Sequence, residues 1–121
     1  MQVKDKRVVV TGAASGIGKA LSVAFHNAGA QSVVAVDMNI KGAEERAKDV
    51  NGIAVEANVG QESDIIKVIE QANELSGGID IFCSNAGIGG VPGFLNVKTE
   101  DWQNIWAVSY THLTLPTILL V

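Results

Sequence analysis

The chain has 121 residues, of which 47% are hydrophobic, and its formal net charge is −4. Because it carries no basic cluster, we expect neither a nucleic acid nor an anionic membrane as a partner. The residues that follow Met1 are polar, so we predict no signal peptide. The single cysteine, Cys83, lies in an apolar run, which indicates a packing role and a reducing, cytoplasmic location.

The first predicted strand covers residues 7–10 and leads into a glycine-rich segment, Thr11–Gly18. Glycines let the backbone turn tightly and approach an anion closely. A helix that starts here adds unpaired N–H groups and the positive end of its dipole. The order strand, turn, helix therefore predicts a phosphate cradle. The alternative is a glycine-rich turn that binds no ligand.

The helix after this turn is predicted from one apolar stripe, and Gly29 ends it. The stripe consists of Ile17, Leu21, Ala24, Phe25 and Ala28.

The second strand covers residues 32–36 and ends at Asp37. An acid about 20 residues beyond such glycines meets the ribose hydroxyls of a bound dinucleotide. Its carboxylate would accept hydrogen bonds from a 2′-hydroxyl and repel a 2′-phosphate, so Asp37 favours NAD over NADP. Alternatively, Asp37 caps the next helix, although Asn39 is available for that role.

The alternation of strands and helices continues along the chain. The predicted elements are a helix over 43–50, a strand over 52–56, a helix over 65–75, a strand over 79–83, a loop over 87–97 and a fourth helix from Thr99. Glycines 77 and 78 end the third helix. Strands that alternate with helices of this length imply right-handed βαβ units and a parallel sheet.

The motifs resemble those of the short-chain dehydrogenase/reductase family. Thr11–Gly18 matches the family pattern Thr-Gly-x-x-x-Gly-x-Gly. A nucleoside-triphosphate loop would instead have Ser or Thr after the lysine, but Lys19 is followed by Ala20. Asn58-Val59 stands where the family usually has Asp-Val, and residues 84–87 (Ser-Asn-Ala-Gly) resemble Asn-Asn-Ala-Gly. The resemblance implies an α/β fold with a Rossmann-type, doubly wound parallel sheet, truncated after about four strands in the order 3-2-1-4.

The resemblance also implies which residues bind the cofactor. They are Gly12, Ser15, Gly16, Ile17, Gly18, Asp37, Met38, Asn58, Val59, Asn85, Ala86 and Gly87. Family members that use NADP carry a basic residue at the position of Ser15 or Met38. The uncharged residues found there imply NAD in preference to NADP.

The family motifs run out after residue 107. We interpret residues 1–107 as the N-terminal half of one NAD-binding domain and residues 108–121 as a tail foreign to the family. Residues 108–117 resemble a translated sequencing adapter, so we expect this tail to be artefactual. A divergent C-terminus and a membrane anchor are alternatives, but polar residues and Pro116 interrupt the tail.

For the whole protein, the resemblance implies an oxidoreductase that transfers hydride between NAD and a secondary alcohol or ketone, and a homo-oligomer. The family's catalytic tyrosine is followed four residues later by a lysine, but Tyr110 is followed by Thr114. We therefore predict no catalytic residue in this chain, and neither His26 nor His112 belongs to a metal site. A non-catalytic NAD-binding fragment and an inactive truncation product are the alternatives. An open edge at the fourth strand predicts poor solubility.

Overall fold

The computed structural model describes residues 2–86 and Gln103. Its elements follow in the order β1 (Arg7–Thr11), α1 (Gly16–Asn27), β2 (Ser32–Asp37), α2 (Ile40–Asp49), β3 (Ile53–Glu56), α3 (Glu62–Ser76) and β4 (Ile81–Cys83). These match the predicted elements in type and order, although α2 and α3 begin three residues earlier than expected and β3 and β4 begin slightly later. Gln103 is helical, and the rest of the predicted fourth helix and the 87–97 loop lie outside the described residues.

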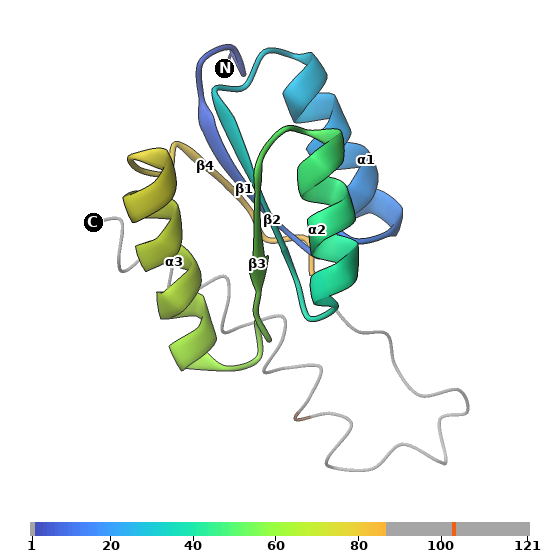
Figure 1. The fold of residues 1–121 in the computed structure, drawn as a ribbon. Helices are drawn as coiled ribbons and strands as arrows, with labels where there is room; N and C mark the ends of the chain where they lie inside the picture. Colours follow the sequence, from blue (N-terminus) through green and yellow to red (C-terminus); the bar gives the residue numbers. More distant parts are fainter. Residues whose placement is uncertain (1, 87–102, 104–121) are drawn as a thin grey trace.

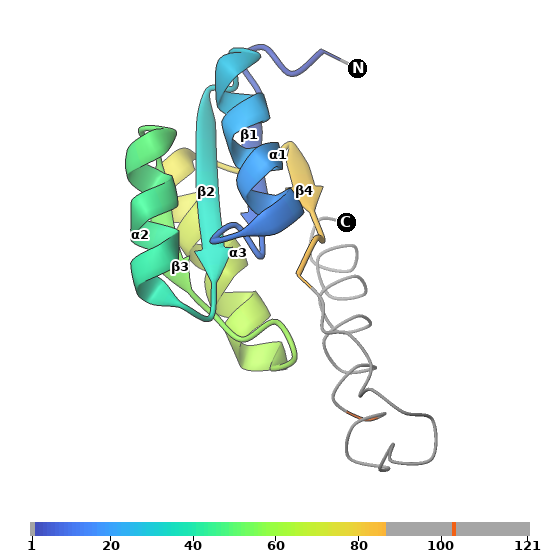
Figure 2. The same ribbon diagram turned by 90° about the vertical axis from the view of Figure 1, so that its right-hand side faces the viewer.

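The strands form one parallel sheet with the predicted order, β3-β2-β1-β4. Helices α1 and α2 cover one face of the sheet and α3 covers the other (Figures 1 and 2). The sheet is therefore doubly wound, with β4 at the edge beside β1 in the described part of the chain. Because the strands are parallel, their carboxyl ends all lie at one end of the sheet, and the loops that carry the predicted site residues emerge there.

The strand residues divide between two apolar layers because successive side chains point to opposite faces. Val9 on β1 packs with Val68 and Ala72 of α3. Its neighbours Val8 and Val10 pack on the other face, with Leu21 and Phe25 of α1. Burial on both faces explains the uninterrupted apolar runs of β1 and β2.

The buried face of α1 differs from the predicted stripe. Gly18 and Ser22 are the buried residues of this helix, whereas Ile17, Ala24 and Ala28 are exposed. The most buried line of the helix thus runs through two small residues, since positions four apart lie on one face, and the half-buried Leu21 and Phe25 beside it pack against the sheet. The buried Ser22 hydroxyl donates to the carbonyl oxygen of Gly18 at 2.8 Å, so its polar group is satisfied.

The other two helices largely keep their predicted faces. Ala43, Ala47 and Val50 are buried around α2, and Ile65, Val68, Ile69 and Ala72 are buried on α3. Leu75 is 58% exposed, because the buried line of α3 continues from Ala72 to the half-buried Ser76, four residues further on. Gly77 then ends α3 in the left-handed conformation with φ +81°. In the described part of the chain, no helix combines the length and the apolarity needed to cross a bilayer.

The edge strand is tied to β1 by an ion pair at the amino ends of the two strands. The Arg7 guanidinium contacts both carboxylate oxygens of Asp80, at 2.9 and 3.0 Å. The Arg7 backbone N–H also donates to this carboxylate, and Arg7 Nη1 donates to the Gly77 carbonyl. The hydrogen bonds from the Arg7 side chain, and after them the bond from its backbone N–H, hold the pKa of Asp80 well below its usual value.

Candidate functional site

The glycine-rich loop after β1 has a backbone that only glycine adopts easily. Gly12 and Gly16 have φ values of +68° and +58°. Gly18 is required for a different reason, because a Cβ at this position would lie 1.9 Å from the carbonyl oxygen of Gly12. The three glycines therefore fold the loop back onto the start of α1. This geometry explains why glycines stand at positions 12, 16 and 18 of the motif.

The start of α1 is open to solvent. Ser15 is its N-cap residue with an extended backbone, and in the described residues no side chain makes a capping hydrogen bond there. Ser15 and Gly16 are exposed, and Ile17 is 72% exposed. The first amides of a helix have no intrahelical acceptor and lie at the positive end of its dipole. This surface has the properties of an anion site.

The Asp37 carboxylate at the end of β2 lies against the glycine-rich loop. One carboxylate oxygen accepts a hydrogen bond from the Ala14 backbone N–H at 3.1 Å, and the other accepts from the Asn39 N–H at 3.0 Å. The cap of α2 is Asn39, whose side chain accepts from the Gly42 N–H. Asp37 is thus not the cap of α2. Each oxygen keeps a further lone pair for a ligand hydroxyl.

Beyond β3, the chain forms a tight turn around Asn58. The Asn58 side-chain oxygen accepts from the Gly60 N–H at 2.9 Å, and the Asn58 N–H donates to the Asp64 carboxylate at 2.8 Å. Val59 is buried with Ile65. Asp64 belongs to the first turn of α3, and the sequence analysis did not single it out. The available signal was an acid directly before the predicted helix over 65–75, since acids are enriched at helix starts.

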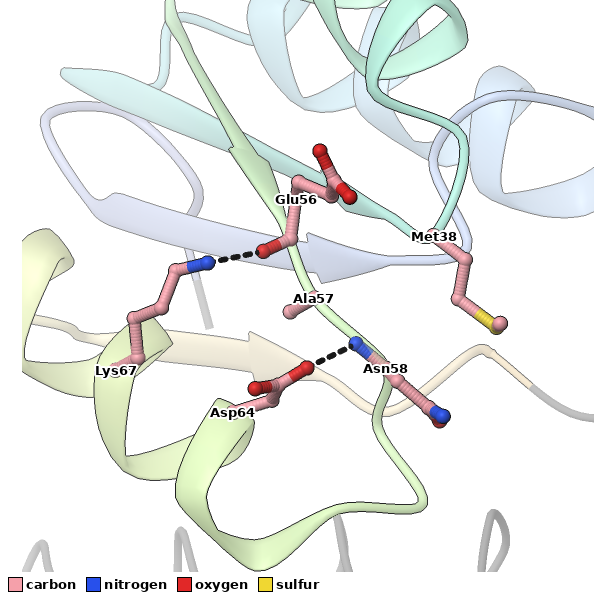
Figure 3. Close-up of a pocket in the computed structure, with 6 residues that line it drawn as sticks. All are labelled: Met38, Glu56, Ala57, Asn58, Asp64 and Lys67. Atoms are coloured by element: carbon pink, nitrogen blue, oxygen red, sulfur yellow. Dashed lines mark hydrogen bonds between the residues drawn. The ribbon is translucent and has the colours of Figure 1, made fainter.

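A pocket of about 320 Å³ opens beside this turn. Its lining residues are Met38, Glu56, Ala57, Asn58, Asp64 and Lys67 (Figure 3). Met38, which follows β2, is 64% exposed. Lys67 donates to the backbone oxygen of Glu56 at 2.6 Å, and among the described residues it pairs with no carboxylate. The pocket therefore combines the apolar Met38 and the amide of Asn58, at the carboxyl ends of β2 and β3, with the charged residues Glu56, Asp64 and Lys67.

The carboxyl ends of β1 and β4 are joined through Thr11. Its buried hydroxyl donates to the Cys83 carbonyl and accepts from the N–H groups of Asn85 and Ala86, both at 3.0 Å. The Asn85 side-chain amide donates to the Thr11 carbonyl at 3.1 Å. Burial raises the pKa of the Cys83 thiol, which suits a packing role. Gly87, which follows in the same motif, lies outside the described residues.

The structure adds a residue that the pattern did not reveal. Arg46 on α2 is 4% exposed, and its guanidinium donates to the backbone oxygens of Ala13 and Ala14 at 3.0 and 3.1 Å. A charged residue in an amphipathic helix is ordinarily expected on the solvent side. The periodicity of α2 therefore carries no signal for this contact.

Comparison with known proteins gives consistent matches. A family model described as short chain dehydrogenase matches residues 6–119. A short chain dehydrogenase from Claviceps purpurea is 31% identical over 113 residues, which cover 89% of this chain and 43% of the relative. The 3-oxoacyl-(acyl-carrier-protein) reductase FabG of Thermotoga maritima is 33% identical over 110 residues, 87% of this chain and 44% of the relative. The chain thus spans less than half the length of these relatives.

A solved structure is similar in fold as well as in sequence. The 3-ketoacyl-(acyl-carrier-protein) reductase from Brucella melitensis, complexed with NADH, superposes with a TM-score of 0.91 at 34% identity. The similarity covers 98% of this chain and 50% of that one.

Proposed function

Because the chain belongs to the short-chain dehydrogenase family, we propose that it is the nucleotide-binding part of an NAD-dependent oxidoreductase. The whole protein would transfer hydride between the nicotinamide and a secondary alcohol or ketone, and it would act as a homo-oligomer in the cytoplasm. When bound, NAD supplies the atom that accepts or donates the hydride. The residues of this chain would bind and orient the dinucleotide.

The observation that carries the proposal is the hydrogen bond between Asp37 and Ala14. It brings an acidic side chain next to a loop that folds back on an open helix start. A dinucleotide needs both features at adjacent positions, because its ribose and its pyrophosphate are neighbours. The Brucella melitensis reductase, which is similar over nearly the whole chain, was solved with NADH, and this supports a nicotinamide cofactor.

Each group of residues would contact one part of the cofactor. The amides of Gly16, Ile17 and Gly18, with Gly12 and the Ser15 hydroxyl, would hold the pyrophosphate. Asp37 would accept the adenosine ribose hydroxyls.

The remaining residues would border the two bases. Met38 and Asn58 would border the adenine in the pocket of Figure 3, and Val59 is the next residue of the same turn. Asn85, Ala86 and Gly87 would line the path toward the nicotinamide.

The charges near Asp37 favour NAD over NADP. A 2′-phosphate would meet the Asp37 carboxylate, and Ser15 and Met38 offer no positive charge. Arg46 is close to the loop, but its side chain is buried and directed at Ala13, Ala14 and Asp49. It would therefore not compensate for a second phosphate.

We expect the chain to bind NAD without turning over a substrate. Its only tyrosine, Tyr110, is not followed by a lysine four residues later, and this segment lies outside the described residues. The alternative is an inactive truncation product, which neither binds NAD nor catalyses a reaction.

Calorimetric titration of the full chain with NAD⁺, NADH and NADP⁺ tests the proposed preference for NAD, and an assay for NADH formation tests the absence of turnover. We expect both NAD forms to bind more tightly than NADP⁺, and we expect no NADH to form when secondary alcohols are added. Absence of NAD binding to folded protein, or tighter binding of NADP⁺, would refute the cofactor proposal. Formation of NADH would refute the absence of turnover.

A further inference from the structure

The loop between β1 and α1 accepts two hydrogen bonds from one buried arginine of α2, Arg46. Arg46 Nε donates to the Ala13 oxygen at 3.0 Å and Nη2 donates to the Ala14 oxygen at 3.1 Å. The remaining nitrogen, Nη1, pairs with the Asp49 carboxylate on the next turn of α2. All three guanidinium nitrogens are thus engaged, two of them by consecutive peptide groups of the same loop.

The burial of Arg46 is not explained by its ion pair alone. Asp49 is half-exposed, and an ion pair at a surface contributes little to stability. Burying a guanidinium is costly unless its donors are satisfied, and here the two loop carbonyls satisfy them. An apolar residue would fill the same space at a lower desolvation cost. The specific property of arginine at this position is therefore its rigid fork of donors, which fits two adjacent carbonyls.

Holding these two carbonyls determines where the next two amides point. In a planar trans peptide, the C=O of one residue and the N–H of the next point in opposite directions. With the Ala13 oxygen turned toward Arg46, the Ala14 N–H points the other way, to the Asp37 carboxylate. With the Ala14 oxygen held in the same manner, the Ser15 N–H is directed away from α2.

A second residue of α2 supports the same loop one turn earlier. A Cβ at Gly42 would lie 2.5 Å from the Cβ of Ala14, so α2 packs directly against the loop. Gly42 and Arg46 are four residues apart and share one face of the helix. The loop is thus clamped between α2 on one side and Asp37 at the end of β2.

We propose that Arg46 is a positioning residue for the dinucleotide: it holds the carbonyls of Ala13 and Ala14, so that the loop leads into the start of α1, whose amides would bind the pyrophosphate, in a fixed conformation before the ligand arrives. The inference rests on the proposed NAD binding. Pre-orienting a loop removes an ordering cost from binding, so the arginine would increase affinity without touching the ligand.

The test compares Arg46→Met, Arg46→Lys and the control Asp49→Asn in the full chain. Each protein is titrated with NAD⁺ and with adenosine, which lacks the pyrophosphate, and its unfolding is measured in urea. The control removes the ion pair of Arg46 but leaves both carbonyl contacts in place.

We expect Arg46→Met to bind NAD⁺ about tenfold more weakly, because two charge-assisted hydrogen bonds to the loop are lost. Arg46→Lys should lie between, since one ammonium cannot match the arginine fork. Adenosine binding should change by less than about twofold, because Asp37 keeps its bond from Asn39. Asp49→Asn should bind NAD⁺ like the wild type even where its stability is lower.

Equal losses for NAD⁺ and adenosine would mean that Arg46 only stabilises the fold, and would overturn the proposal. Unchanged NAD⁺ binding in Arg46→Met, or a loss in Asp49→Asn as large as in Arg46→Met, would overturn it as well. Should Arg46→Met not fold, the comparison of Arg46→Lys with Asp49→Asn decides in the same way. If the folded wild type itself bound no NAD⁺, the proposed function would fail, and this inference would fall with it.

Discussion

Asn85 binds Thr11 through both its backbone and its side chain. The Asn85 N–H donates to the Thr11 hydroxyl at 3.0 Å, and the Asn85 side-chain amide donates to the Thr11 carbonyl at 3.1 Å. Together with the register of Val8 opposite Ile81, these bonds fix β4 beside β1 at its carboxyl end. The residue that opens the glycine-rich loop therefore also positions the segment that follows β4.

Thr11→Val should weaken this junction. Valine has nearly the same shape but no hydroxyl, so the N–H groups of Asn85 and Ala86 lose their acceptor. We expect a loss of about 1–3 kcal/mol in the free energy of unfolding, measured in urea. Thr11→Ser keeps the hydroxyl and serves as the control. Equal stability of the two variants would contradict the hydrogen-bonding role.

Asp37→Ser should change the preference between the two dinucleotides. The substitution removes the charged acceptor for the ribose hydroxyls and the repulsion of a 2′-phosphate. We expect NAD⁺ binding to weaken about tenfold and the ratio of NADP⁺ to NAD⁺ affinity to rise, as measured by calorimetry.

The exposed Glu44 on α2 provides the matched control, because Glu44→Gln removes the same charge away from the loop. A similar change of preference in Glu44→Gln would assign the effect to net charge. An unchanged preference in Asp37→Ser would remove Asp37 from the ribose site.

The parallel sheet could be predicted because β-branched runs alternate with helical stripes, whereas its strand order was implied by the resemblance to the family. Turn chemistry added the ends of elements, and Gly29 and Gly77 both have positive φ at the predicted stops. Asn39 as the cap of α2 was also within reach of the sequence. These features depend on residues close together in the chain.

The features that could not be predicted depend on packing between distant segments. Arg46 contacts the loop at Ala13 and Ala14 because α2 crosses it, and helix periodicity carries no information on that approach. Ile17 was placed on the apolar side of α1, yet it is exposed, whereas Gly18 and Ser22 are buried. A small residue allows a close approach that hydrophobicity alone does not reveal.

Gly18→Ala and Gly16→Ala should differ sharply, although both add one methyl group. At Gly18 the new Cβ would lie 1.9 Å from the Gly12 oxygen and 2.6 Å from the Asn85 side-chain nitrogen, so backbone must shift. At Gly16 it would meet nothing within 4 Å, and the only cost is the positive φ, about 1–2 kcal/mol.

We expect Gly16→Ala to fold with modestly lower stability and Gly18→Ala to lose more than this and to bind NAD⁺ poorly. Urea unfolding and calorimetry of both variants provide the measurement. If Gly18→Ala were the more stable of the two, this would contradict the close approach of α1 to the loop at Gly18.

The ion pair between Arg7 and Asp80 should make part of the stability depend on pH. Its hydrogen bonds lower the pKa of Asp80 in the folded chain, whereas an unfolded aspartate has a pKa of about 3.9. A carboxyl with a lowered folded pKa stabilises the fold above the unfolded value, and this contribution is lost as the pH falls through the folded value. Asp80→Asn should thus be less stable than the wild type near neutral pH, with the difference shrinking in acid.

A double-mutant cycle with Arg7→Met separates the pair from other acid-sensitive groups. Urea unfolding of the wild type, Asp80→Asn, Arg7→Met and the double variant gives the coupling between the two side chains. The coupling should be favourable near neutral pH and should decline progressively below about pH 4, because the unfolded aspartate then takes up a proton that the paired carboxylate resists. A coupling that stayed constant across this range would show that the charge of Asp80 does not hold β4 against β1.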